Sequence, residues 1–139
     1  MVKFNFPHRN SWVKTIACGG VTLLLCLLSG GLNESRGDVP ETQKHEVAHL
    51  LDFVSQSGCL MKRNGSQHTA QEAVKHIQKK YDYYRDRIKT TEDFIDRAAS
   101  HSSLSGKSYK ILCPGEKPRI TSAWLKEELR RFRKQQTGS

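Results

Sequence analysis

The chain has 139 residues, with 23 Lys and Arg against 14 Asp and Glu, so its formal net charge is +9. This length fits one small domain, and the sequence contains no internal repeat, which excludes a repeat protein and a two-domain architecture. The positive charge favours anionic partners.

The first segment of the chain has the layout of an export signal. Basic residues precede an apolar run over residues 13–28, and the small residues Ser29 to Gly31 follow it. This order is typical of a signal peptide. A membrane-spanning helix needs about 20 apolar residues, and this run is shorter and interrupted by glycines. We predict a signal peptide over residues 1–31, with cleavage as late as residue 37 as an alternative. The protein would then be exported, periplasmic or secreted, with no stable membrane span after cleavage; an uncleaved anchor is the competing interpretation.

The remainder is expected to be a basic domain with one pair of cysteines. Of the 23 basic and 14 acidic residues, four and one precede Asp38, which leaves a net charge of +6. We expect one globular domain over residues 38–134 and a flexible tail at 135–139. Cys59 and Cys113 form an even pair, which in a small exported domain is typical of a disulfide. In the chain-entropy model, closing that loop stabilises the fold by about 4 kcal/mol.

Apolar residues recur at helical spacing in four segments of this domain. Capping residues, proline and glycine indicate where the segments begin and end. The predicted helices run from about Glu41 to Ser57, from Thr69 through Ile88, from Thr90 through Ala98, and from about Ser122 through Phe132 into a basic end.

Two short extended segments, Cys59 to Arg63 and Tyr109 to Cys113, each end at a turn signal. Antiparallel pairing places the disulfide and the apolar residues on one side, which makes the register self-consistent. The facing pairs are Cys59 with Cys113, Met61 with Ile111, Arg63 with Tyr109, and, on the other side, Lys62 with Lys110. The sequence therefore predicts a mainly helical α+β fold, with about four helices and a two-stranded antiparallel piece linked by one disulfide.

Seven short segments in a fixed order carry a family resemblance. They are Leu50–Val54, Ser57–Cys59, Arg63–Gly65, Lys80–Tyr81, Thr91–Ile95, Ser103–Lys107 and Trp124–Leu125. In these segments the chain resembles the YfeK-like family of small exported bacterial proteins of unknown function. The resemblance implies an envelope-exported, cysteine-paired domain and supplies no catalytic residues.

Residues His45 to His49 form an H-E-x-x-H motif. In zinc proteases the two histidines of this motif bind zinc and the glutamate, here Glu46, activates a water. At about 100° per residue, His45 and His49 lie opposite the apolar stripe of their helix and are expected to face water. A catalytic zinc also needs a third ligand and a water-restricted cleft. Zinc-dependent hydrolysis, with zinc as cofactor, is therefore kept as the alternative function.

The segment His101 to Ser108 resembles a phosphate loop, but an exported domain with no preceding buried strand is the wrong setting for a nucleotide site. Two interpretations stay open. Its hydroxyls and Lys107 could hold an anion, or Ser100, Ser103 and Ser105 could cap a helix and satisfy loop backbone groups, which we favour.

The leading hypothesis is a non-enzymatic binding domain for an anionic ligand or an unknown envelope partner, with no cofactor and no nucleic acid. Its candidate ligand-binding residues are Arg63, Asn64, His68, Ser103, Ser105, Lys107 and Tyr109. A further possibility is interaction through the basic segment Arg130 to Lys134, which would attract anionic lipid or polymer.

Overall fold

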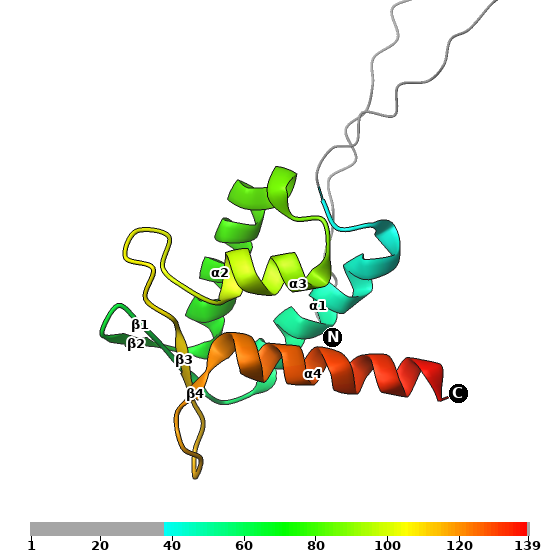
Figure 1. Ribbon diagram of the computed structural model, residues 1–139. Coiled ribbons are helices and arrows are strands. Elements are labelled where there is room, and N and C mark those ends of the chain that lie inside the picture. The colour runs from blue at the N-terminus through cyan, green and yellow to red at the C-terminus, as the bar shows by residue number, and fades with distance from the viewer. Residues whose placement is uncertain (1–37, 139) are drawn as a thin grey trace, which may run out of the picture. The chain divides into compact units, whose positions relative to one another are not determined.

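The computed structural model describes residues 38–138, and helices make up most of them (Figure 1). The elements in chain order are α1 (Glu41–Gln56), β1 (Leu60–Arg63), β2 (Ser66–His68), α2 (Ala70–Tyr84), the 3-10 turn η1 (Arg85–Arg87), α3 (Thr91–Phe94), the π-helical turn η2 (Ile95–Ala99), β3 (Lys110–Leu112), β4 (Arg119–Ile120) and α4 (Thr121–Thr137). The predicted mainly helical α+β class with four helices is confirmed. The predicted signal peptide and both cleavage positions lie outside the described residues.

Capping explains why the starts of α2 and α3 were predictable. The Thr69 hydroxyl accepts from the Glu72 amide and the Glu72 carboxylate accepts from the Thr69 amide, which closes the capping box of α2. Thr90 accepts from the Asp93 amide at the start of α3. The last helix, α4, continues to Thr137 and ends at Gly138, so the predicted tail residues 135–137 are helical.

The sheet has four antiparallel strands in the order β2-β1-β3-β4, not two. The register between β1 and β3 is the predicted one, with Met61 opposite Ile111, and the disulfide Cys59–Cys113 is present. The first missed strand, β2, pairs with β1 through a two-residue turn in which Asn64 and Gly65 both have positive φ. The second missed strand, β4, has two residues and pairs with β3.

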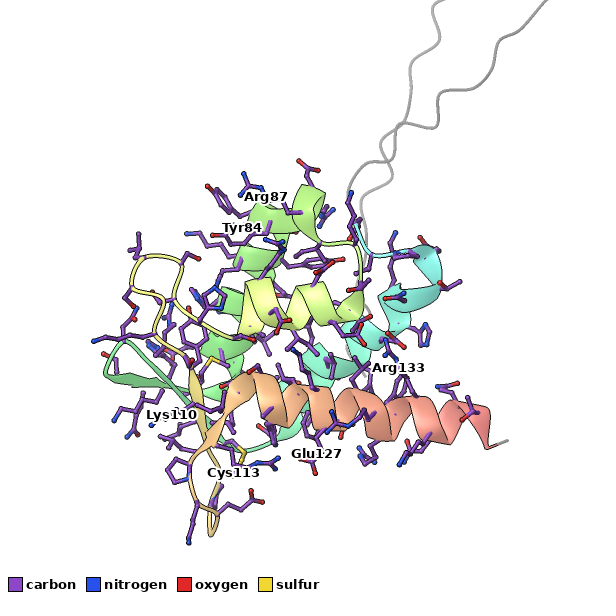
Figure 2. The ribbon with its side chains drawn as sticks, viewed as in Figure 1. Tyr84, Arg87, Lys110, Cys113, Glu127 and Arg133 are labelled. Carbon is purple, nitrogen blue, oxygen red and sulfur yellow. A yellow bond between two sulfur atoms is a disulfide. The ribbon has the colours of Figure 1, made fainter. Side chains whose placement is uncertain are left out.

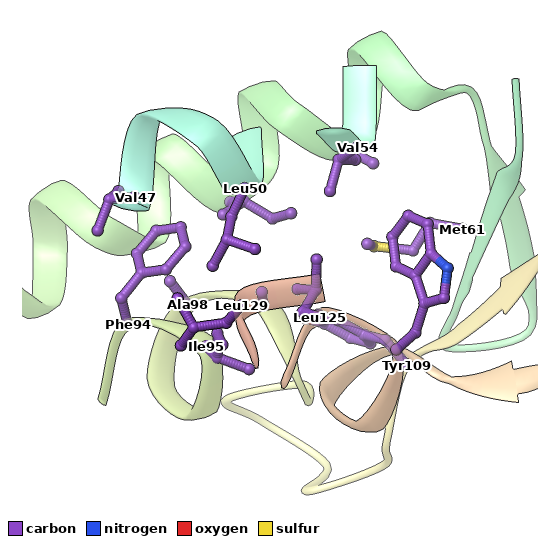
Figure 3. Packing of buried hydrophobic residues seen from close by; sticks show 14 of the residues in the cluster. Val47, Leu50, Val54, Met61, Phe94, Ile95, Ala98, Tyr109, Leu125 and Leu129 are labelled. Carbon is purple, nitrogen blue, oxygen red and sulfur yellow. The ribbon is translucent and has the colours of Figure 1, made fainter. Parts of the chain in front are cut away.

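One core lies between the helices and one face of this sheet. Figure 3 shows Val47, Leu50 and Val54 projecting from α1 toward the residues of η2 and α4. The sheet contributes Met61 and Ile111, both nearly inaccessible to solvent. None of the helices in the described residues is long and apolar enough to span a membrane.

Candidate functional site

The candidate site begins at Arg63, at the end of β1. Side chains two residues apart in a strand lie on the same face, so Arg63 shares the inner face with buried Met61. Its guanidinium meets two imidazoles there: Nη1 donates to His76 Nδ1 of α2 at 2.7 Å, and Nη2 lies 3.3 Å from His68 Nε2 of β2. All three side chains are half-buried.

Tyr109 closes the inner side of this group. Its ring is buried, and its hydroxyl oxygen lies 3.1 Å from His76 Nε2. Burial raises the pKa of the Tyr109 phenol, and Arg63 opposes that rise. The phenol therefore stays protonated at neutral pH and keeps a hydrogen to donate.

Lys80 adds a second positive charge, one helical turn after His76. It is buried, and its Nζ donates to the His101 carbonyl at 2.6 Å. The same Nζ lies 5.5 Å from the ring centroid of Tyr109 and 5.9 Å from that of Tyr84, within the range of cation–π interaction. Burial and the charge of Arg63 lower the pKa of Lys80.

The charges around His76 are all positive. Burial, as the largest cause, together with Arg63, Lys80, His68 and Lys79 in that order of importance, lowers the pKa of His76 to about 4. The imidazole is therefore neutral near pH 7. Among the described residues, the side-chain hydrogen bonds of Arg63 and Lys80 go to imidazole nitrogens and a backbone carbonyl, and neither cation pairs with a carboxylate. Arg63, His68, His76, Lys80 and Tyr109 are called the Arg63 cluster below.

The loop over residues 101–108 lies against the β1–β2 turn. The Asn64 side chain joins the two, donating to Ser102 Oγ at 3.4 Å and accepting from Ser105 Oγ at 3.1 Å. Within the loop, the Ser105 amide donates to Ser102 Oγ and the Lys107 amide to Ser105 Oγ. Ser100, which follows the last residue of η2, donates from its Oγ to the carbonyl of Ile95, the first residue of that turn. For Ser100 and Ser105 these contacts agree with the favoured interpretation of serines that satisfy backbone groups, whereas Ser102 takes part in place of Ser103.

Five of the seven candidate residues meet in one place: Arg63, His68 and Tyr109 in the cluster, Asn64 and Ser105 beside it. Ser103 and Lys107 are exposed, and their side chains make no hydrogen bond to the described residues.

Three further residues lie at this place and were not among the predicted site residues, namely His76, Lys80 and Ser102. A signal existed for Lys80, because it follows Ala73 and Ile77 at helical spacing on the buried stripe of α2. A lysine on an apolar stripe needs a partner, and that would have drawn attention to this helix.

The H-E-x-x-H residues lie elsewhere, where α1 meets α4. Glu46 is buried and accepts from Arg133 Nε at 2.7 Å and Nη2 at 2.8 Å, and from the Thr91 hydroxyl at 2.5 Å. The hydrogen bond from Arg133 is the main cause that lowers the pKa of Glu46. Because its carboxylate is held in this ion pair, Glu46 is not poised to activate a water.

The two histidines of the motif differ from each other. His45 is exposed, as expected, whereas His49 is half-buried: it donates to the Glu128 carboxylate at 2.6 Å and stacks on Phe132 with ring centroids 3.9 Å apart. In the part of the chain that the structure describes, no three His, Cys, Asp or Glu side chains are grouped to hold a metal ion. The geometry thus gives the motif packing roles and no third zinc ligand.

A shallow cleft of about 380 Å³ opens beside His49. Its lining residues are His49, Asp52, Phe53, Gln56, Ser57 and Arg131. Its charged groups are Asp52 and Arg131, and Arg131 is already bound to Glu128, so the cleft offers no cation that is free to hold an anion.

Comparisons with known proteins show the family of this chain and leave its activity open. A family of unknown function, DUF5329, matches residues 41–133. The uncharacterised protein YfeK of Salmonella typhimurium is 37% identical over 98 residues, which cover 70% of this chain and 77% of that protein. No solved structure matches. The family match and the identity to YfeK confirm the expected resemblance, and the chain belongs to the DUF5329 family.

Proposed function

We propose that this protein is a non-enzymatic domain that binds a small oxyanion, a phosphate or a carboxylate, at the Arg63 cluster. We also propose that it works in the cell envelope, the compartment to which the predicted signal peptide would direct it. The disulfide supports that compartment, because such bonds persist in oxidising surroundings.

One observation carries the binding proposal: the half-buried Arg63 guanidinium is held by two imidazoles, next to buried Lys80, without a carboxylate. A charge partly removed from water is stabilised by an opposite charge, and the fold supplies none at this place among the described residues. A bound anion would provide the missing charge.

The shape and the hydrogen-bonding groups of the Arg63 cluster are also suited to an oxyanion. Arginine presents a planar fork that matches carboxylate and phosphate oxygens, and the imidazoles fix its orientation before a ligand arrives. Because Arg63, His68 and His76 are half-buried, the group is reachable from solvent. The exposed amine of Lys107 would add attraction over the neighbouring loop.

The test is titration with inorganic phosphate and with citrate, against sodium chloride of matched ionic strength, followed by calorimetry and by the amide NMR shifts of β1, β2 and α2. Arg63→Gln should weaken binding roughly tenfold or more, because a hydrogen bond to a charged group contributes about 1.5–3 kcal/mol. Lys107→Ala should weaken it less while leaving the melting temperature nearly unchanged.

The matched control is Arg87→Gln. It removes the same charge from an exposed residue that forms no ion pair with the described residues. Equal losses in the Arg63 and Arg87 variants, or shifts that spread evenly over the surface, would show charge screening and sink the proposed site.

A further inference from the structure

The solvent side of the sheet forms a second basic surface, distinct from the Arg63 cluster. Since Met61 and Ile111 point into the core, their neighbours along β1 and β3 point outward. The register gives two rows on this side. They are Leu60 beside Leu112, and Gln67, Lys62, Lys110 and Ile120 in succession. These six residues are called the outer sheet face.

The two lysines of the outer sheet face stand directly opposite each other. Like charges in facing positions destabilise an antiparallel pair. Neither Lys62 nor Lys110 forms an ion pair with the described residues, and the four strands contain no acidic residue. By contrast Arg119, on the inner face, is paired with Glu127 of α4. The unfavourable lysine pair is thus left facing solvent.

Apolar side chains surround these lysines. Leu60 is 38% exposed and Ile120 is 41% exposed, although aliphatic side chains on a small domain are more often covered. Figure 2 shows Lys110 on the sheet, at the end of the molecule away from Arg133. A soluble polyanion would bind only the lysines of this face. An anionic lipid surface would bind both kinds of residue, because the amines reach the lipid phosphates and the aliphatic groups enter the boundary between headgroups and acyl chains.

We propose that the outer sheet face docks on a membrane surface rich in anionic lipid. Charge complementarity and the adjoining aliphatic groups select this occupant. The inference is independent of the Arg63 cluster, because Arg63 lies on the opposite face of the same sheet.

The experiment uses protein purified from the exported fraction of a bacterial host, with its intact mass recorded, so that every variant carries the same N-terminus. Its partition onto vesicles of phosphatidylglycerol mixed with phosphatidylcholine is compared with partition onto pure phosphatidylcholine. The wild-type protein should prefer the anionic vesicles. Lys62→Gln with Lys110→Gln should weaken that partition roughly tenfold or more, at about fivefold per lysine.

The matched control is Arg130→Gln with Lys134→Gln, which removes two exposed charges from α4. It also tests the basic segment that the sequence singled out. Equal losses in both double variants, a loss confined to the α4 variant, or no preference of the wild-type protein for anionic vesicles would each overturn the proposal.

The contribution of the aliphatic residues is tested by the double variant Leu60→Thr with Ile120→Thr. Partition onto anionic vesicles should fall severalfold, while binding to soluble polyphosphate stays the same. If vesicle binding does not fall, the surface recognises soluble polyanions and lipid docking is wrong.

A measurement on the wild-type protein tests the same proposal without relying on variants that could fold poorly. Spin-labelled phosphatidylglycerol in small bicelles should broaden the amide signals of β1, β3 and β4 more than those of α1 and α4. The opposite pattern would overturn the proposal.

Discussion

The helical end and the sheet end of the molecule treat a half-buried arginine in opposite ways. At the helical end, Arg133, labelled in Figure 2, extends from α4 and donates to Glu46 of α1 at 2.7 Å and to Glu92 of α3 at 2.6 Å. At the sheet end, Arg63 meets two imidazoles, lies near Tyr109 and Lys80, and has no carboxylate partner among the described residues. The charge of Arg133 is matched within the fold and joins three helices. The charge of Arg63 is not matched by the described residues, which is why the sheet end is the better candidate for a ligand.

The two ends are also held together by different interactions. The helical end is held by ion pairs and apolar packing, whereas β1 and β3, which position Arg63 and Tyr109, are joined by the disulfide Cys59–Cys113. A cluster of like charges pushes its own elements apart, and a covalent link resists this at any pH and salt concentration.

Removing the disulfide should have the largest effect. The cysteines are 54 residues apart, so Cys59→Ala with Cys113→Ala should lower the free energy of unfolding by about 4 kcal/mol in the chain-entropy model. Urea denaturation of the variant and of the wild-type protein measures this. Wild-type protein under reducing conditions should lose a similar amount, and a loss below about 1 kcal/mol would mean that the sheet end holds together without its covalent link.

Arg133→Met should cause the next largest loss of stability. It leaves Glu46 and Glu92 without their partner, which is strongly destabilising at a buried site. Because Arg133 is 40% exposed, we expect about 2–3 kcal/mol, below the range for fully buried pairs. The control, Arg131→Met, breaks a pair whose arginine is 56% exposed and whose carboxylate, Glu128, keeps its hydrogen bond from His49, so the loss of stability should be clearly smaller.

The pH dependence of the stability of Arg133→Met tests the role of its ion pairs. Arg133 is the first cause that lowers the pKa of both Glu46 and Glu92. The stability from these carboxylates is present above their ordinary pKa values and is lost as pH falls through their lowered ones. The difference in the free energy of unfolding between the wild-type protein and Arg133→Met should therefore become smaller toward acidic pH. A constant difference would mean that Arg133 acts by packing alone.

Local chemistry decided what the sequence could predict. The starts of α2 and α3 follow from side chains within three residues of each other, and the β1–β3 register follows from alternation together with the cysteine pair. The strands β2 and β4 are too short to show alternation: one is wholly polar, and the other has two residues.

The partners of charged groups were not predictable for a different reason. Arg133 and Glu46 are 87 residues apart in the chain, and no local pattern connects them. The role of Glu46 within H-E-x-x-H was therefore undecided until the packing of α4 on α1 was known. Likewise Arg63 was predictable as a neighbour of Tyr109, whereas His76 entered the cluster only because α2 packs over that end of the sheet.

The smallest expected effect is a change in one titration, and it separates a structural from a ligand-binding role for Arg63. In the wild-type protein an NMR titration should find the pKa of His76 at about 4. Because the folded protein favours the neutral imidazole, this group lowers the stability of the fold as pH drops from about 6.5 to about 4, and no further below that. Arg63→Gln should raise the pKa only part of the way toward 6.5, since burial is the larger cause. Arg87→Gln should leave it unchanged.

Phosphate completes this last test. A bound anion offsets the charges of Arg63 and Lys80, so it should raise the pKa of His76 in the wild-type protein. It should have little further effect once Arg63 has been replaced. If phosphate raises the pKa equally in both proteins, the anion acts through general screening, and the unmatched charge of Arg63 is a feature of the fold alone. If only the wild-type protein responds, the contrast between Arg63 and Arg133 is one between a ligand-binding cation and a structural one.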